Sequence, residues 1–575
     1  MFQQPLKKKN PKGLENFKGD IFFYKQDRND YFHISYQYAT SSFRNIKDMN
    51  PKYILYPKAD NEDDFDDIYT ALNYAKDNKS KIAIRTGGHQ YTGASSTDRN
   101  NIQLDLSNTY KKFEWNEDKT ELEIGISYIL DDFAKKLQDN GCFLPIGQCE
   151  YVGLGGHVQT GGYGQLARGF GLLADYIIAI RIISYDETEE KYIEKWIKKG
   201  DELFRAVIGG SPGNFGVITH VRLRVEHDED YPNSYGLFAV CPYHPKTFKD
   251  FLDIMLTTVD EDDFDYCVSI ISDTGIKDEE ADNDDPSYDE TYNQQSYTNR
   301  GNKNVIWPAL IIIHAYQYSG YDEKSSPINK IKAVTKELNI LNDGYTKISL
   351  LVRDWITLIR REFQLQYIKR GYFSDWEAEK LIETNWSDWA TNRVNLAICQ
   401  DLKVSAQYKY FGGKNSAFYK KGIEHQNDIS ISWRTMNFGV SFDVFFEKEN
   451  FQLASEFQRE NDKCISVTNP IFCDKDMRLL WATYDLNLDY FHDRYYDSED
   501  KYTELCELRD KYDPDKIFIP NNFCVGVKRE PSEEVLNDIL EKNKNKFLDM
   551  LNPPENSDID YSPIWDTWGR KRTNK

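Results

Sequence analysis

The spacing of apolar and polar residues predicts alternating strands and helices over the first part of the chain. Short apolar runs at 53–56, 82–84, 122–126 and 177–183 indicate strands. Between them, apolar residues three or four positions apart predict helices over 65–78 and 129–138. Residues 1–45 show no clear periodicity. This mixture of elements indicates an α+β or α/β class.

A second region, from about 228 to 478, carries longer apolar runs. Those at 235–241, 305–313 and 440–446 predict strands. An acidic stretch at 277–285 leads into a polar segment that ends near 304, and we predict a long solvated insertion there. The pattern of residues 481–524 again predicts a compact, folded segment. Beyond 528 the chain turns polar, with an amphipathic helix expected at about 535–551.

Composition narrows the function classes without naming a function. The 575 residues include 72 Lys plus Arg and 94 Asp plus Glu, for a net charge of −22. Nucleic acids and anionic membranes require a basic surface, so we expect neither as a partner. The 39 Tyr and 32 Phe argue against a wholly disordered acidic chain.

Targeting signals and metal motifs are not evident in the sequence. No apolar segment follows the N-terminus, and the longest apolar run, 305–313, is too short to cross a bilayer. We therefore expect a cytoplasmic protein, or one exported or packaged by a non-classical route. The nine cysteines contain no C-x-x-C pair, which favours reduced thiols and no metal site.

Two glycine-rich segments carry the chemistry. The first, 85–96, reads RTGGHQYTGASS and follows a predicted strand, and the second, 147–164, reads GQCEYVGLGGHVQTGGYG with seven glycines. Glycine lets backbone N–H groups approach an anion closely. Such a glycine density predicts no regular strand or helix, so a large ligand lying against the backbone would offset the lost entropy. His89 and Cys149 add reactive side chains.

Two common nucleotide motifs fit the second segment poorly. The spacing from Gly156 to Gly161 is that of a P-loop, but Gly162 stands where the motif needs Lys. Residues 162–167 read G-x-G-x-x-A with Asp186 about twenty residues on, which half-fits a dinucleotide fingerprint. That fingerprint should follow a clean strand, whereas here further glycines precede it.

The segments resemble those of flavoproteins of the vanillyl-alcohol-oxidase and berberine-bridge-enzyme type, which include carbohydrate oxidases. Residues 85–95 are similar to that family's R-[S/T]-G-G-H-x-[Y/F]-x-G-x-S loop, and residues 147–164 to its G-x-C-x-x-V-G-x-G-G-H…G-G-x-G stretch. Further similar motifs follow in order: GLLAD at 171–175, DELF at 201–204, GNFGVIT at 213–219 and KYDPDKIF at 511–518. The resemblance is strong over about 48–226 and moderate over 481–524.

The resemblance implies an α+β protein with a two-subdomain, PCMH-type FAD-binding domain and an α+β substrate domain with an antiparallel sheet. The implied divisions are an N-terminal extension at 1–47, the FAD-binding domain at 48–226, the substrate domain at 227–480 with its acidic insertion at about 277–304, a returning berberine-bridge-like segment at 481–527 and a polar tail at 528–575.

The resemblance also implies bound FAD and assigns residues to it. His89 would bond to the flavin 8α-methyl carbon and Cys149 to flavin C6, since imidazole and thiolate are nucleophiles that can add to an oxidised flavin ring. His157 would pack beside the flavin without bonding to it. The pyrophosphate would meet Arg85, Thr86, Gly87 and Gly88, and the adenosine and ring would lie along Gly153, Gly156, Gly161, Gly162 and Val217. Further expected cofactor contacts are Gly93, Ser95, Gly147, Gln148, Val152, Gly164, Asp175, Gly216 and Asn521.

The implied activity is oxidation of a CH–OH group, in a sugar or another alcohol. A base takes the hydroxyl proton while hydride moves to flavin N5, and O₂ is then reduced to H₂O₂. In relatives, valine at the position of Val152 accompanies oxidases. Carbohydrate-oxidising relatives show a Y-x-N-Y element, but residues 481–487 read WATYDLN, so the pattern is broken. Tyr484 is the candidate base if nearby charge lowers its pKa from about 10, and a core tyrosine is the alternative.

Two other functions remain open on sequence alone. One is a flavin dehydrogenase that passes electrons to an acceptor other than O₂. The other is a non-catalytic structural protein that retains the flavin fold, which the broken base motif and the acidic insertion favour.

Overall fold

The computed structural model describes residues 10–23, 31, 34–35, 37, 49–91, 93–258, 263–272, 309–358, 366–400, 402–446, 450–466, 470–475, 477–478, 494–521 and 524–527. The expected helix at about 535–551, the acidic insertion at 277–304 and the segment 481–487 with Tyr484 lie outside these residues. Among the described helices, none has the length and apolar character needed to cross a membrane.

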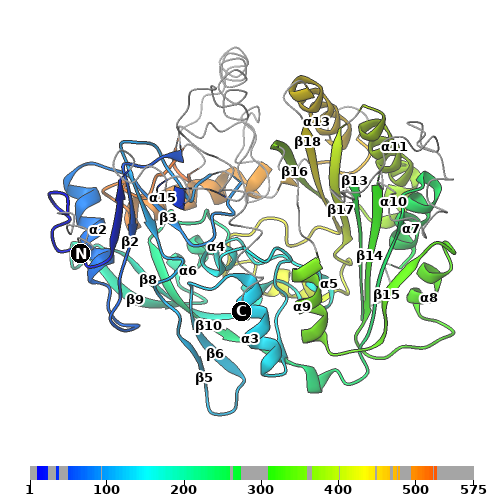
Figure 1. The fold of residues 1–575 in the computed structure, drawn as a ribbon, viewed down its shortest axis with the longest axis horizontal. Coiled ribbons are helices and arrows are strands. Elements are labelled where there is room, and N and C mark those ends of the chain that lie inside the picture. The colour runs from blue at the N-terminus through cyan, green and yellow to red at the C-terminus, as the bar shows by residue number, and fades with distance from the viewer. Residues whose placement is uncertain are drawn as a thin grey trace, which may run out of the picture.

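The first part of the chain forms two sheets and the short helices between them (Figure 1). A four-stranded sheet has the order β1-β2-β4-β3, in which β4 runs parallel to β2 and β3, and β1 runs antiparallel to β2. Its strands are β1 (Asp20–Phe23), β2 (Tyr53–Tyr56), β3 (Ile82–Arg85) and β4 (Ile102–Asp105). Helix α2 (Asp66–Asp77) turns its buried Ile68, Leu72 and Ala75 toward the core, as the spacing predicts.

The second sheet is antiparallel and has five strands in the order β5-β6-β10-β8-β9. These are β5 (Phe113–Trp115), β6 (Glu121–Gly125), β8 (Ile177–Asp186), β9 (Lys191–Lys198) and β10 (Val217–Arg224). A two-stranded pair joins β7 (Cys142–Phe143) to β11 (Glu226–His227). The helical segments of this part are α3 (Leu130–Asp139), α4 (Leu154–Gln159), α5 (Ala167–Phe170), η2 (Leu173–Tyr176), α6 (Glu202–Val207) and η3 (Asp228–Asp230).

An eight-stranded antiparallel sheet dominates the second part of the chain. Its order is β15-β12-β14-β13-β17-β18-β16-β19. The strands are β12 (Tyr235–Pro242), β13 (Phe264–Ser272), β14 (Ala309–Gln317), β15 (Asn339–Tyr345), β16 (Gln366–Ser374), β17 (Lys403–Tyr410), β18 (Phe438–Phe446) and β19 (Met477–Arg478). The helices are α7 (Pro245–Thr257), α8 (Pro327–Lys332), α9 (Ile348–Leu358), α10 (Ala378–Glu383), α11 (Trp386–Cys399), α12 (Ala417–Glu424) and α13 (Phe451–Ser466).

Most of the described helices that pack on this sheet cover one of its faces, while α5 packs against β13 on the other face, where the Gly169 N–H donates to Asp265 at 3.1 Å. Helices α7, α11 and α13 pack against β13, β16, β17 and β18, and α10 packs on α7 and α11 (Figure 1). Tyr408 of β17 points to this side, where its ring meets Phe248 of α7 and Trp386 of α11. Because side chains alternate along a strand, the neighbours of Tyr408 turn to the opposite face, which is the face that meets the glycine-rich segments.

The C-terminal segment returns to the first part of the chain. Helix α15 (Glu499–Tyr512) leads into residues 513–521, where the Ile517 carbonyl accepts a hydrogen bond from the Ile82 N–H at the start of β3 (2.8 Å). The fully buried Asn214 donates to the Phe518 carbonyl at 2.9 Å and accepts from the Val525 N–H at 3.0 Å. Both contacts fix the segment against the first two sheets.

The predicted α+β class is confirmed, and the described strands and helices overlap those predicted from periodicity. The structure differs from the expectations drawn from the sequence in two places. Residues 147–164 were expected to form no regular element, yet α4 lies within them, and Gln159 steadies it by donating from Nε2 to the Gly155 carbonyl at 2.9 Å. Strand β1 lies within residues 1–45, where the sequence shows no clear periodicity. Its backbone pairing with β2, and not an alternation of apolar residues, holds it in the sheet.

Candidate active site

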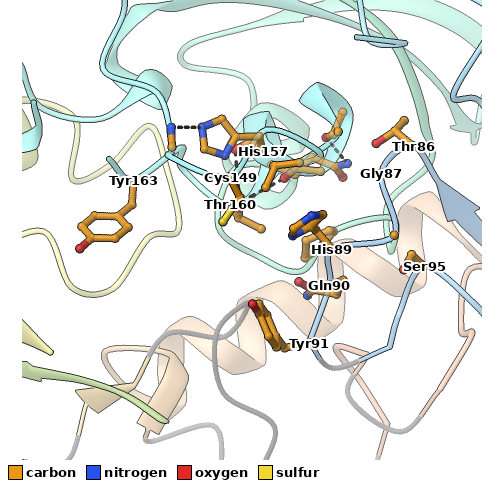
Figure 2. Close-up of a pocket in the computed structure, with 18 of the residues that line it drawn as sticks. Thr86, Gly87, His89, Gln90, Tyr91, Ser95, Cys149, His157, Thr160 and Tyr163 are labelled. Atoms are coloured by element: carbon orange, nitrogen blue, oxygen red, sulfur yellow. Dashed lines mark hydrogen bonds between the residues drawn. The ribbon is translucent and has the colours of Figure 1, made fainter. Parts of the chain in front are cut away.

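A large cavity lies where the two glycine-rich segments face the open side of the eight-stranded sheet. It contains about 1540 Å³ of space not filled by atoms, part of which opens to solvent. Its wall includes both reactive side chains that the sequence singles out, His89 and Cys149 (Figure 2). A ligand that fills this cavity would therefore contact both segments.

The two glycine-rich loops touch backbone to backbone on the cavity wall. A Cβ on Gly87 would lie 2.2 Å from the Gly153 nitrogen, and a Cβ on Gly153 would lie 2.4 Å from the Gly87 nitrogen. No side chain fits at either position, so these glycines permit the contact itself. Gly156 differs, because a Cβ there would meet no atom within 4 Å. This glycine borders open space in the cavity.

The loop that carries Cys149 is held by His157. The Gly147 N–H donates to Nε2 of His157 at 3.0 Å (Figure 2). Burial lowers the pKa of His157 to about 3, so its ring is neutral near pH 7 and Nε2 can accept this bond. Val152 also fixes the loop, since its N–H donates to the Cys149 carbonyl at 3.2 Å and its carbonyl accepts from the Leu130 N–H at 2.9 Å.

Arg85 is anchored by groups of the protein. Its Nε lies 3.4 Å from a carboxylate oxygen of the buried Asp105, and its Nη1 donates to the Ile34 carbonyl. The guanidinium therefore brings positive charge to this end of the cavity in a fixed orientation.

Most of the predicted cofactor residues line the cavity, and some do not. Those on its wall are Arg85, Thr86, Gly87, Gly88, His89, Ser95, Gly147, Gln148, Cys149, Val152, Gly153, Gly156 and His157. Those that do not line it are Gly93, Gly161, Gly162, Gly164, Asp175, Gly216, Val217 and Asn521.

Several residues away from the wall have evident structural roles. Gly161 and Gly162 adopt φ of +96° and +72°, a region that favours glycine, at the end of α4. Asp175 forms a bidentate ion pair with Arg434 at 2.8 and 2.9 Å. Burial acts to raise the pKa of Asp175, but the charge and hydrogen bonds of Arg434 outweigh it and the pKa is lowered. A helix, not a strand, precedes Gly162, so the dinucleotide fingerprint lacks its required setting.

The far wall of the cavity is formed by residues that the sequence analysis did not single out. They come from the open face of the eight-stranded sheet and lie in two rows across its strands. In the first row, Ser269, Gln407 and Ser441 stand opposite one another on β13, β17 and β18. In the second, Ile271, Ser405, Asp443 and Lys369 follow one another from β13 to β16, and all of them except Asp443 line the cavity. In β17, polar residues alternate with apolar ones at Ser405, Gln407 and Lys409. This alternation is the feature of the sequence that could have indicated the wall residues of β17.

Lys369 is the charged side chain of this wall. It is 8% exposed, and its Nζ lies 2.9 and 3.1 Å from the two carboxylate oxygens of the fully buried Asp443. The same Nζ lies 4.9 Å from the centre of the Tyr91 ring, which belongs to the His89 loop. Lys369 thus spans the gap between the sheet and the glycine-rich segments.

Buried polar contacts fix the sheet against those segments. Lys409 of β17 donates from Nζ to the Gly164 carbonyl at 2.6 Å and also to the Gln165 carbonyl, and it lies 3.3 Å from Asp265. Burial lowers the pKa of Lys409, although the charge of Asp265 opposes the shift. Near the cavity, Gln407 donates to the side chain of Gln148 at 2.8 Å.

Comparison with known proteins places these features in a family context. A family model described as an FAD binding domain matches residues 59–191. The aclacinomycin-N/aclacinomycin-A oxidase of Streptomyces galilaeus is 31% identical over 164 residues, which are 28% of this chain and 30% of that protein. Berberine bridge enzyme-like 11 of Arabidopsis thaliana is 32% identical over 148 residues, 25% of this chain and 27% of that protein. The matches thus span less than a third of either relative.

Solved structures extend the likeness to nearly the whole chain. A glucooligosaccharide oxidase from Acremonium strictum superposes with a TM-score of 0.64 at 16% identity, over 90% of this chain and 98% of that chain. The 6-hydroxy-D-nicotine oxidase from Arthrobacter nicotinovorans gives 0.64 at 16% identity, over 88% and 98%. At such identities these superpositions establish the fold.

Proposed function

From its FAD-binding domain and its fold, which are those of FAD-linked oxidoreductases of the vanillyl-alcohol-oxidase and berberine-bridge-enzyme type, we propose that this chain is an oxidase of CH–OH groups. The overall reaction is R₂CHOH + O₂ → R₂C=O + H₂O₂. The observation that carries the proposal is that His89 and Cys149 line one cavity together with the glycines that can admit a cofactor.

The lining of the cavity suits FAD in its residues and in its charge. Its wall includes residues of both glycine-rich segments and of the eight-stranded sheet, and Gly156 leaves open space beside the backbone. No Asp or Glu occurs among the lining residues that the structure describes, and Arg85 supplies positive charge. These features favour a long ligand with an anionic centre such as a pyrophosphate.

We assign His89 and Cys149 to covalent attachment of FAD, through the 8α-methyl carbon and C6 respectively. A structure of the Acremonium strictum glucooligosaccharide oxidase, with a TM-score of 0.65 at 16% identity, is described with a 6-S-cysteinyl, 8α-N1-histidyl FAD. The neutral His157 supports the assignment, since its bond to Gly147 steadies the Cys149 loop. When bound, FAD supplies a two-electron acceptor for hydride.

The protein's own contribution is to position the substrate. The His89 and Cys149 loops form one wall and the sheet rows with Gln407 and Ser441 form the other. A substrate held between them is oriented before reaction, which converts binding energy into rate. Val152 lies on the wall next to the Cys149 loop, at the position where we expect access of O₂ to be set.

Peptide mapping tests the covalent assignment. Acid-precipitated protein should be yellow, and the peptides around His89 and Cys149 should carry the mass of the flavin. His89→Ala or Cys149→Ala should each leave one link, and the double variant should release all flavin on denaturation. Cys142→Ala is the control, because Cys142 is buried away from the cavity. A colourless pellet, or unmodified peptides, refutes the assignment.

Reoxidation kinetics test the oxidase assignment against a dehydrogenase. After anaerobic reduction by dithionite, mixing with O₂ should restore the oxidised spectrum rapidly, and Val152→Leu should slow this step. Slow reoxidation of the wild-type protein, with fast reoxidation by a quinone or dye, would establish the dehydrogenase instead.

A further inference from the structure

The charge on the cavity wall differs from that of the rest of the molecule. The chain carries 94 acidic and 72 basic residues, yet the described lining contains Arg85 and Lys369 and neither Asp nor Glu. Arg85 belongs to the first glycine-rich segment and pairs with Asp105. Lys369 belongs to the opposite wall, on the sheet. The cavity wall therefore presents two cationic groups, each paired with a buried carboxylate, Asp105 or Asp443, that does not itself line the cavity.

Lys369 is a buried residue of the cavity wall and not a surface lysine. Its side chain is 7% exposed, and Asp443 behind it is fully buried. Ammonium groups have three N–H donors. The carboxylate of Asp443 fixes the position of Nζ from behind, while Lys369, and not Asp443, lines the cavity. A ligand group entering the cavity therefore meets the cation before the carboxylate.

The neighbours of Lys369 on this face are hydrogen-bonding groups. Ser405 stands next to Asp443 across the sheet, and Ser441 lies two residues before Asp443 on the same face. Gln407 stands opposite Ser441. All three line the cavity with Lys369. The wall thus combines a fixed cation with hydroxyl and amide groups, and its described lining residues include no aromatic ring from the sheet.

We propose that the substrate is a hydroxylated anion, a sugar acid or a sugar phosphate, whose charged oxygens bind Lys369 while Ser405, Ser441 and Gln407 bind its hydroxyl groups. The inference rests on the proposed function and names its substrate class. The anionic group is unchanged in the reaction. The oxidised carbon loses hydride and its hydroxyl loses a proton, and both hydrogens and the electron pair leave in H₂O₂.

Three compounds that share one ring and differ at C6 provide the test. Glucose, glucuronate and glucose 6-phosphate are compared by kcat/KM for H₂O₂ formation, and by the spectral change of the bound flavin on anaerobic titration, which also detects ligands that are not turned over. We expect at least one anion to be preferred over glucose by tenfold or more. Preference for glucuronate identifies a carboxylate, and preference for glucose 6-phosphate a phosphate.

Variants connect the preference to the wall. Lys369→Gln should lower the anion-to-glucose ratio of kcat/KM at least tenfold, mainly through KM, and Lys369→Arg should restore part of it. Lys403→Gln is the matched control, because Lys403 lies in the same sheet, on β17, and does not line the cavity. If Lys369→Gln does not fold, the Lys369→Arg protein still tests the proposal, since a longer cation should change the order of preference between the two anions.

The results separate this inference from the proposed function. A protein without flavin refutes the proposed function. A yellow protein that reoxidises rapidly but binds glucose and both anions with equal affinity refutes only the proposed substrate class. An anion preference that Lys369→Gln or Lys369→Arg leaves unaltered also refutes it, because another site must then hold the charge.

Discussion

Gly156→Ala separates binding of FAD from stability of the protein. In most of the glycine-rich wall an added methyl group would strike the protein itself, as at Gly87 and Gly153. At Gly156 it would meet no atom within 4 Å and would extend into open space of the cavity. The substitution therefore changes the space for the ligand with little change in the space for the protein.

The change in protein stability and the change in FAD affinity can each be given a magnitude. Gly156 lies within helix α4, and replacement of a helical glycine by alanine stabilises by roughly 0.5–1 kcal/mol. An extra methyl group in a closely packed site costs about 1–3 kcal/mol. At 1.4 kcal/mol per tenfold change, FAD affinity should fall by about 5- to 150-fold.

The assay uses a background of His89→Ala and Cys149→Ala, in which FAD is held without covalent bonds. The dissociation constant of FAD is measured by quenching of flavin fluorescence, and the stability of the flavin-free protein by urea unfolding. Gly344→Ala is the control, because an added Cβ there also meets no atom and Gly344 does not line the cavity. Unchanged FAD affinity would show that FAD does not lie against Gly156.

Three further predictions concern parts of the same framework. Asp265→Asn leaves Lys409 buried without its charged partner, and should lower the free energy of unfolding by about 3–5 kcal/mol. Burial lowers the pKa of His157 from 6.5 to about 3, so the unfolded state takes up a proton before the folded state does as pH falls. The free energy of unfolding should therefore drop by about 2 kcal/mol from pH 7 to pH 5. His157→Gln should remove this drop. Gly87→Ala should separate the glycine-rich loops and reduce flavin content even when the protein folds, as measured by the ratio of flavin to protein absorbance.

These predictions have direct controls. Asp250→Asn removes an exposed partner of Lys246 and should change the free energy of unfolding by less than about 1 kcal/mol. If Asp265→Asn is as mild as this control, the buried pair does not hold the sheet. If the pH dependence survives in His157→Gln, another group titrates in that range.

The glycine-rich loops were predictable because their information is local. Each of them is a single stretch of sequence whose glycines and reactive side chains stand at fixed spacing, so His89 and Cys149 could be singled out before any fold was known. The same local reasoning failed for α4, because glycine disfavours helix in isolation. Here the contact of Gly153 with Gly87 and the bond of Gln159 to Gly155 outweigh that preference.

The sheet wall could not be predicted because its information is not local. Lys369 and Asp443 are distant in sequence and meet only through the register of β16 against β18. A shift of that register by one residue would turn Lys369 toward the helices. Alternation in β17 shows that Ser405 and Gln407 share a face, but not that this face is the open one. That follows from the helices covering the other side.

The cavity lies between two parts of the chain, so its shape depends on how firmly they are joined. Buried ion pairs are a poor source of stability, since removing charges from water offsets much of their attraction. Their geometry is nevertheless strict. Lys409 binds carbonyl groups of the second glycine-rich segment while it pairs with Asp265, and Arg434 pairs with Asp175 across the same boundary. Misplacement by about 1 Å can lower a rate about 100-fold, so pairs that hold the sheet wall at a fixed distance from His89 and Cys149 serve orientation more than stability.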